Sequence, residues 1–216
     1  MALTTVKNAG LTKRGFPTAR SASPLIINGD MAVSQRGTSF SPSGTSPYTL
    51  DRYQYSTTGG ATGDATITQT ADAPDDTPFR NCFKITPDAT ETPTGSENIV
   101  LSTTLEGQDM QVLEHGKTNP SKATLSFWVK SNKTGTYCLQ VKEETISNES
   151  YILFEYTINS SDTWEQKILT WTGNTAHSLD NDNTAGIRFV WHLAVGPDDY
   201  AAATTTWTVS SSFKAT

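Results

Sequence analysis

Residues 124–130 read Thr-Leu-Ser-Phe-Trp-Val-Lys, and they give the clearest indication of the fold class. Leu125, Phe127 and Val129 recur at every second position, and the turn sequence SNKTGT follows directly. Because successive side chains of a β-strand point to opposite faces, this spacing predicts a strand with one apolar face. We therefore expect Leu125, Phe127 and Val129 to face the main core.

Nine further short runs of the same character are separated by segments rich in Gly, Pro, Ser, Thr and Asn. They are Leu25–Ile27, Ala65–Thr70, Cys82–Ile85, Asn98–Leu105, Tyr137–Lys142, Tyr151–Ile158, Trp164–Trp171, Ile187–Leu193 and Thr205–Ser210. About ten strands at this spacing predict an all-β sandwich or barrel. One segment, Gly107–Leu113, has an apolar stripe at helical spacing and predicts a single short helix.

The composition excludes several classes of protein. The chain has 216 residues, a formal net charge of -6 and 18% charged residues, and this acidic balance argues against nucleic-acid binding. It has no apolar run long enough to span a membrane and no signal-peptide pattern, so we expect no membrane insertion. The two cysteines, Cys82 and Cys138, lie in strand-like runs and are expected to be free thiols.

Residues 1–24 differ from the rest of the chain. They carry Lys7, Lys13, Arg14 and Arg20 and no acid, since the first carboxylate of the sequence is Asp30. They show no hydrophobic period, so they cannot bury a face by themselves and are expected to be extended. We predict two parts, an extended basic docking arm (1–24) and a β-sandwich domain (25–216). A simple unstructured terminus is the alternative.

The sequence offers no recognisable catalytic group. His115, His177 and His192 are scattered without a partner at metal or triad spacing. The motifs of serine hydrolases, phosphate-binding loops and zinc proteases do not occur, although sequence alone does not measure the separation of a glycosidase carboxylate pair. We expect the protein not to be an enzyme and to need no cofactor.

Two sets of residues are candidates for binding. Asp180 and Asp182, in the run Asp-Asn-Asp-Asn, bear oxygen ligands that suit Ca²⁺, although Asp and Asn also favour turns. Tyr53, Tyr55 and Trp128 are candidates for contact with a glycan or a protein partner, because flat rings stack on both. For Trp128 the general tendency of tryptophan favours a place in the core. The Asp51–Arg52 pair is expected to fix local structure.

Six segments of the sequence together suggest a family. These are LIINGDMAVSQRGTSF (25–40), YTLDRYQY (48–55), LEGQDMQVL (105–113), ATLSFWVKSNKTGTYCLQV (123–141), YTINSSDTWEQKILTWTG (156–173) and DNDNTAGIRF (180–189). Together they resemble the β-sandwich module of tailed-phage virion proteins, particularly tail fibres and related appendages, over about residues 25–210. More distantly, they resemble jelly-roll carbohydrate-binding modules. The resemblance implies a jelly-roll-like antiparallel β-sandwich, a virion location and contact with host surface polysaccharide.

The sequence departs from such modules after residue 203. They usually end in a further closing strand, whereas this sequence ends in TTTWTVSSSFKAT (204–216). Either the chain is truncated or a neighbouring subunit covers the edge of the strand Thr205–Ser210. The second explanation predicts a homo-oligomer, and the resemblance to phage fibres favours a trimer.

The sequence and the resemblance together suggest three alternative functions. The favoured one is a structural virion protein on the tail or capsid surface, attached to other virion proteins through residues 1–24. The second is a carbohydrate-binding module of a secreted glycan-degrading enzyme, and the third is a glycan-cleaving enzyme such as a depolymerase.

Overall fold

The computed structural model describes residues 25–42, 47–61, 63–90, 92–144, 150–199 and 202–209. Its strands are β1 (Ser39–Phe40), β2 (Tyr53–Thr58), β3 (Ala65–Thr70), β4 (Cys82–Pro87), β5 (Asn98–Glu106), β6 (Lys122–Val129), β7 (Gly135–Glu143), β8 (Ser150–Ile158), β9 (Glu165–Thr172), β10 (Ala185–Val195) and β11 (Thr204–Val209). Two short 3₁₀ helices are η1 (Gly107–Leu113) and η2 (Pro197–Asp199).

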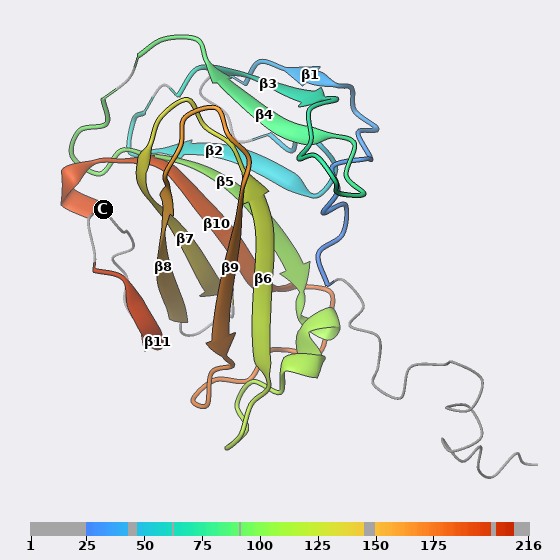
Figure 1. Ribbon diagram of the computed structural model, residues 1–216. Helices are drawn as coiled ribbons and strands as arrows, with labels where there is room; N and C mark the ends of the chain where they lie inside the picture. Colours follow the sequence, from blue (N-terminus) through green and yellow to red (C-terminus); the bar gives the residue numbers. More distant parts are fainter. Residues whose placement is uncertain are drawn as a thin grey trace, which may run out of the picture.

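The strands form one large sheet and two small ones. The large sheet has the order β11-β8-β7-β10-β5-β2, and the small sheets have the orders β1-β3-β4 and β6-β9. All the pairings are antiparallel. In Figure 1 the pair β6-β9 lies in front of the large sheet and the sheet β1-β3-β4 lies above it. The all-β sandwich that the sequence predicts is therefore confirmed.

The connectivity has the winding of a jelly roll. β7 pairs with β8, β6 with β9, and β5 with β10, so three antiparallel pairs are nested within one another along the chain. The pairs β5-β10 and β7-β8 lie in the large sheet, whereas β6-β9 lies in the opposite layer. A folded ribbon of strands that wraps around one core gives this arrangement.

The main core fills the space between the large sheet and β6-β9. Leu125 is buried, Phe127 and Val129 pack against the same cluster, and the Phe127 ring meets the rings of Tyr156 and Trp191 edge to face at 5.2 and 5.7 Å between centroids. The expected orientation of β6 is confirmed. From η1, Met110 and Leu113 are buried in this core beside Leu105 of β5, as its helical spacing predicts. The other buried members are Leu139, Val141, Ile152, Tyr156, Ile158, Trp171, Leu179, Ile187 and Phe189.

A second, smaller core lies under the sheet β1-β3-β4. Its buried side chains are Leu50, Tyr55, Ala61, Ala65, Ile67 and Ile99. They come from β2, β3, β5 and the loops beside them, so this core joins the small sheet to one edge of the large sheet. Cys82 and Cys138 form no disulfide in this structure.

Two local expectations are corrected. Residues Leu25–Ile27 form turns and bends rather than a strand, because Asn28 and Met31 adopt positive φ angles of 58° and 55° that curl the chain. Conversely, the predicted strands include none at residues 53–58, where Tyr53 and Tyr55 were candidates for binding, whereas the structure forms β2 there. Its pairing with β5 from Tyr53↔Thr103 to Thr58↔Asn98 makes β2 an edge strand of the large sheet.

Candidate functional site

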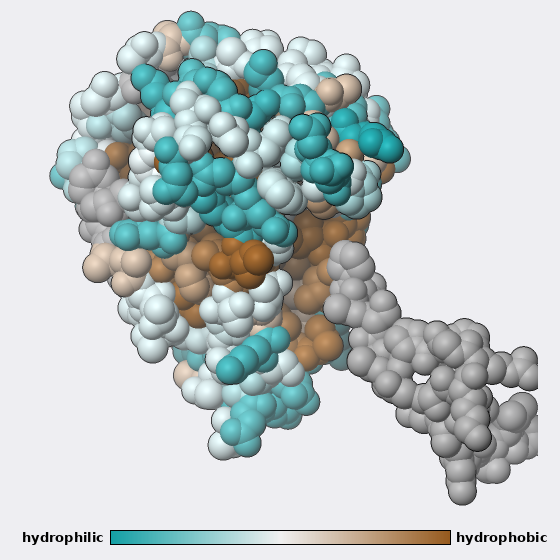
Figure 2. All heavy atoms as spheres, viewed as in Figure 1, coloured by the Kyte–Doolittle hydropathy of each residue, from teal (hydrophilic) through white to brown (hydrophobic). Residues whose placement is uncertain are grey.

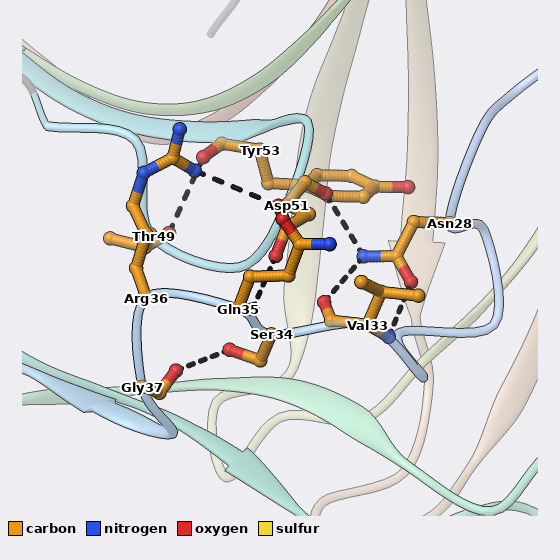
Figure 3. Close-up of polar contacts among 9 residues, drawn as sticks. All are labelled: Asn28, Val33, Ser34, Gln35, Arg36, Gly37, Thr49, Asp51 and Tyr53. Carbon is orange, nitrogen blue, oxygen red and sulfur yellow. Dashed lines mark hydrogen bonds and ion pairs between the residues drawn. The ribbon is translucent and has the colours of Figure 1, made fainter.

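Residues 25–37, here called the arm root, join the sandwich to residues 1–24. Asn28 organises this segment with three hydrogen bonds (Figure 3). Its Nδ2 donates to the carbonyl oxygens of Val33 and Asp51, both at 2.9 Å, and its Oδ1 accepts from the Val33 amide at 2.8 Å. One side chain thus closes the turn at 28–33 and fastens it to the 48–53 segment, which is 23 residues away along the chain.

Asp51 holds the far end of the arm root. Its Oδ2 accepts from the Gln35 amide at 2.7 Å, and its Oδ1 lies 3.8 Å from Nη1 of Arg36. The Arg36 guanidinium also lies over the Tyr48 ring, 5.9 Å from its centroid. Asp51 therefore fixes local structure, as the sequence indicates.

Three residues other than glycine hold left-handed backbone conformations at this site. They are Asn28, Met31 and Arg52, the last with φ 73°. Asn tolerates this region, whereas Met and Arg rarely adopt it and need support from their surroundings. The Met31 carbonyl accepts from Gln69 Nε2 of β3 at 2.6 Å, and Arg52 Nη1 lies 3.7 Å from Glu106 Oε1 of β5. The arm root is consequently tied to the sheet β1-β3-β4 through Gln69, and the 48–53 segment is tied to the large sheet through Glu106.

Exposed apolar side chains gather around the same site. Six large hydrophobic residues are exposed among those described, and four of them belong to the arm root or the 48–53 segment: Leu25, Ile27, Val33 and Tyr48. Figure 2 shows hydrophobic surface on the flank at the right of the view, below the sheet β1-β3-β4. Scattered exposed hydrophobic residues are ordinary, but a concentration of this kind is typical of an interaction surface.

A second candidate surface is the outer face of β6-β9. Trp128 lies there, half-buried, opposite Gln166, and the neighbouring Ile168 is 62% exposed. The expectation that Trp128 belongs to the core is therefore corrected. Its neighbours Phe127 and Val129 take the inward face, so alternation turns Trp128 outward.

Trp164 lies beside this face in a fixed position. Its Nε1 donates to Asp72 Oδ1 at 3.2 Å, Lys130 Nζ lies 5.1 Å from its ring centroid, and Lys130 also forms an ion pair with Asp72. The hydrogen bonds from Lys130 and Trp164 lower the pKa of the Asp72 carboxyl, because both stabilise its ionised form. The outer face thus presents an aromatic ring, Trp128, next to an ordered cluster of Asp72, Lys130 and Trp164.

The other residues that the sequence singled out have different places. Tyr53 and Tyr55 are only 3% and 2% exposed, so in this structure neither offers a surface to a ligand. The hydroxyl of Tyr55 donates to the Gly63 carbonyl, and burial raises the pKa of Tyr53. Lys7, Lys13, Arg14 and Arg20 lie outside the described residues.

Asp180 and Asp182 belong to the loop that precedes β10. Asp182 Oδ1 accepts from both the amide and the hydroxyl of Thr184, and these bonds lower the pKa of Asp182. The Asp182 carbonyl accepts from the Gln108 amide of η1. No group of three or more His, Cys, Asp or Glu side chains within the described part of the chain is placed to hold a metal. Calcium binding by this loop stays a prediction.

The structure contains a buried polar network that the sequence did not predict. His115 Nδ1 lies 2.5 Å from Glu143 Oε1, and Asn174 Nδ2 donates to Glu143 Oε2 at 2.8 Å. All three residues are buried, and the His115 ring lies roughly perpendicular to the ring of Trp207 in β11, with 5.2 Å between their centroids. His115 therefore has the acidic partner that the sequence did not reveal. The sequence does contain one indication of this network. Glu143 alternates with Leu139 and Val141 and so shares the inward face of β7, where a carboxylate needs a polar partner.

This network closes one end of the main core. Gly173 permits it, since a Cβ at that position would lie 2.8 Å from Cδ2 of His115. Trp207 covers it and donates from its indole nitrogen to the Thr172 carbonyl at 2.8 Å. With the His115 side chain only 1% exposed, the pair is inaccessible to a substrate in this structure.

Comparison with known proteins gives one similarity. No family model matches the chain, and no curated protein matches it. Among solved structures, the chain is similar to the enzymatically active domain of tailspike protein 4 from bacteriophage CBA120, with a TM-score of 0.42 and 20% sequence identity. The similarity covers 68% of this chain and 18% of the tailspike chain.

This similarity corrects one expectation. The lack of catalytic motifs predicted a protein that is not an enzyme, whereas the similar structure is described as an enzymatically active domain. The assignment as a non-enzyme is therefore withdrawn.

Among the described residues, no helix is long and apolar enough to cross a membrane.

Proposed function

We propose that this chain is a structural subunit associated with a phage tail, in which the sandwich is the body and residues 1–24 attach it to other virion proteins. The observation that carries the proposal is the arm root. An attachment segment must transmit force to the body, and Asn28, Asp51 and Gln69 connect the arm root to β3 and to the turn before β2. The ordered sequence segments that resemble phage appendage modules support the same function.

Deletion of residues 2–24 tests this proposal. The truncated protein should keep its melting temperature within about one or two degrees, because the deleted residues have no hydrophobic pattern with which to contribute to a core. It should no longer be incorporated into particles. Particles that carry the truncated protein at normal copy number would refute the attachment role.

A second function, contact with host surface polysaccharide, is favoured by the outer face of β6-β9. The Trp128 ring, beside the Asp72–Lys130–Trp164 cluster, combines an aromatic surface with polar groups, which is the chemistry that recognises a sugar ring. Trp128→Ala should abolish retention on immobilised host polysaccharide and leave the fold intact. Ile168→Ala on the same face is the matched control. Reducing ends released from the polysaccharide, measured in the same experiment, report any cleavage.

We also propose a homo-oligomer, with three subunits as the first candidate. β11 is an edge strand of the large sheet, and no other strand pairs with its outer side among the described residues. Its ladder to β8 is interrupted between Thr204 and Thr208. Exposed strand edges recruit other chains, so a neighbouring subunit would stabilise this edge. Sedimentation at micromolar concentration distinguishes a trimer from a monomer of 23.4 kDa.

A further inference from the structure

The charges of this chain are divided unequally along the sequence. Residues 1–24 carry four Lys and Arg and no acid, whereas residues 25–216 carry the other 12 Lys and Arg against all 22 Asp and Glu. The formal charge is therefore +4 in the first segment and -10 in the rest. A second copy of this chain is consequently an acidic partner for the basic segment.

One flank of the sandwich combines acidic and apolar exposed groups. It is formed by η1 and the residues beside it, and we call it the η1 flank: Ile27, Glu106, Asp109, Val112 and Glu114. Asp109 lines an open depression of about 640 Å³ together with Val112 and Glu114. On its other side it adjoins a closely packed part of the surface formed by Ile27, Arg52 and Glu106.

The charged groups of the flank are available to differing extents. Asp109 and Glu114 are exposed, whereas Glu106 is engaged by Arg52 and by Gln108. Val112 and Ile27 are each 45% exposed. The flank can therefore accept a segment that has both cations and apolar side chains. Residues 1–24 have this composition, with Leu3 and Val6 before the first basic residue and Leu11 and Phe16 between later ones.

We propose that residues 1–24 of one copy bind the η1 flank of a second copy. This goes beyond the proposed function, which attaches the protein to other virion proteins, because here the surface that receives residues 1–24 belongs to a second copy of the same chain. A fully extended segment of 24 residues reaches about 80 Å, while a sandwich of this size is about 40 Å across. The segment therefore reaches a neighbour. A contact between two different surfaces closes into a ring when the rotation allows, which is compatible with a trimer.

Charge reversal on each side tests the proposal. One variant carries Asp109→Lys with Glu114→Lys, and the other carries Lys13→Glu with Arg14→Glu and Arg20→Glu. Each variant alone should self-associate at least about tenfold more weakly than the parent at low salt, because like charges then face each other. The association of the parent should weaken as salt is added.

Mixing the two variants distinguishes binding between copies from binding within one copy. In the mixture, the basic segment of the first variant meets the acidic flank of the second, and the acidic segment of the second meets the basic flank of the first. Association between the two variants should therefore return, measured by sedimentation with one variant labelled. No recovery would overturn binding between copies and indicate that each chain binds its own flank.

The control variant carries Asp64→Lys with Asp75→Lys, at exposed positions near β3. It changes the net charge by the same amount as the flank variant Asp109→Lys with Glu114→Lys. It should associate like the parent, and all variants should melt within about two degrees of it. A monomeric parent, or undiminished association of the flank variant, would overturn the proposal. Neither outcome decides attachment to the particle, which the deletion of residues 2–24 measures separately.

Discussion

In the main core, side chains that meet across two sheets are apolar and buried, whereas in the arm root the contacts are polar and largely exposed. Phe127, Tyr156 and Trp191 lock together through ring edges and faces, but Asn28 and Asp51 work through hydrogen bonds to backbone atoms. Burial of apolar area supplies most of the stability of a domain. Directional hydrogen bonds contribute less energy and fix position more narrowly. We therefore expect the main core to determine stability and the arm root to determine where residues 1–24 leave the body.

The largest expected effect is the loss of stability when an aromatic ring is removed from the main core. Phe127→Ala should lower the free energy of unfolding by about 3 to 5 kcal/mol, because it removes a ring from the main core and leaves a cavity. Chemical denaturation measures the change. Ile168→Ala, on the exposed face of the same small sheet, is the control and should change stability by less than about 0.5 kcal/mol. A larger loss of stability for Ile168→Ala than for Phe127→Ala would show that the two faces of β6-β9 are assigned the wrong way round.

The next effect concerns the polar network that closes the main core. Glu143→Leu should cost about 3 kcal/mol or more, because it leaves His115 and Asn174 buried without their acceptor. The double variant His115→Phe with Glu143→Leu should lose less stability than the sum of the two single variants. Strict additivity in this double-mutant cycle would mean that the two residues do not interact as the structure indicates.

A smaller effect is expected in the arm root. Asn28→Ala should cost about 1 to 2 kcal/mol, because it removes three hydrogen bonds and places a less tolerant residue at positive φ. Asn28→Gly removes the same hydrogen bonds but suits the backbone conformation, so it should cost less. If the two variants have equal stability, the left-handed conformation carries no strain and the hydrogen bonds alone account for the loss.

The smallest effect concerns Glu165, the partly buried first residue of β9, whose carboxylate accepts hydrogen bonds from the turn after β8. Hydrogen bonds from Lys167, Ser160 and Asn159 lower its pKa to about 2. Because the pKa of the folded state lies below that of the unfolded state, the stabilisation is present above about pH 4.3 and is lost as the pH falls toward 2. Glu165→Gln should lower the melting temperature slightly at pH 6, and the difference from the parent should disappear near pH 2. A difference that persists at pH 2 would exclude ionisation of Glu165 as its cause.

Several features of the fold were predictable from local pattern. Alternation placed Leu125, Phe127 and Val129 inward, and helical spacing identified η1, because the geometry of a strand or a helical turn assigns each side chain to a face regardless of what lies opposite. The same rule failed at Leu25–Ile27. Apolar character alone does not distinguish a strand from a segment that Asn28 and Met31 curl by positive φ.

The candidate sites were less predictable. Trp128 was singled out for a contact role, and the structure gives it an outer face, whereas Tyr53 and Tyr55 are hidden in the body of the protein. An aromatic side chain suits both places equally well, so its residue type does not decide between them.

The all-β class, the short helix and the contrast between a basic first segment and an acidic body follow from the order of the amino acids, because strand alternation, helical spacing and charge are properties of neighbouring residues. Which distant residues meet depends on the folded arrangement. Asn28 reaches the Asp51 carbonyl across 23 residues, and His115 reaches Glu143 across 28. The physical reason is the jelly-roll winding. It brings segments from separate strand pairs together at the ends of the sandwich, where a buried or strained polar group must find its partner across the fold.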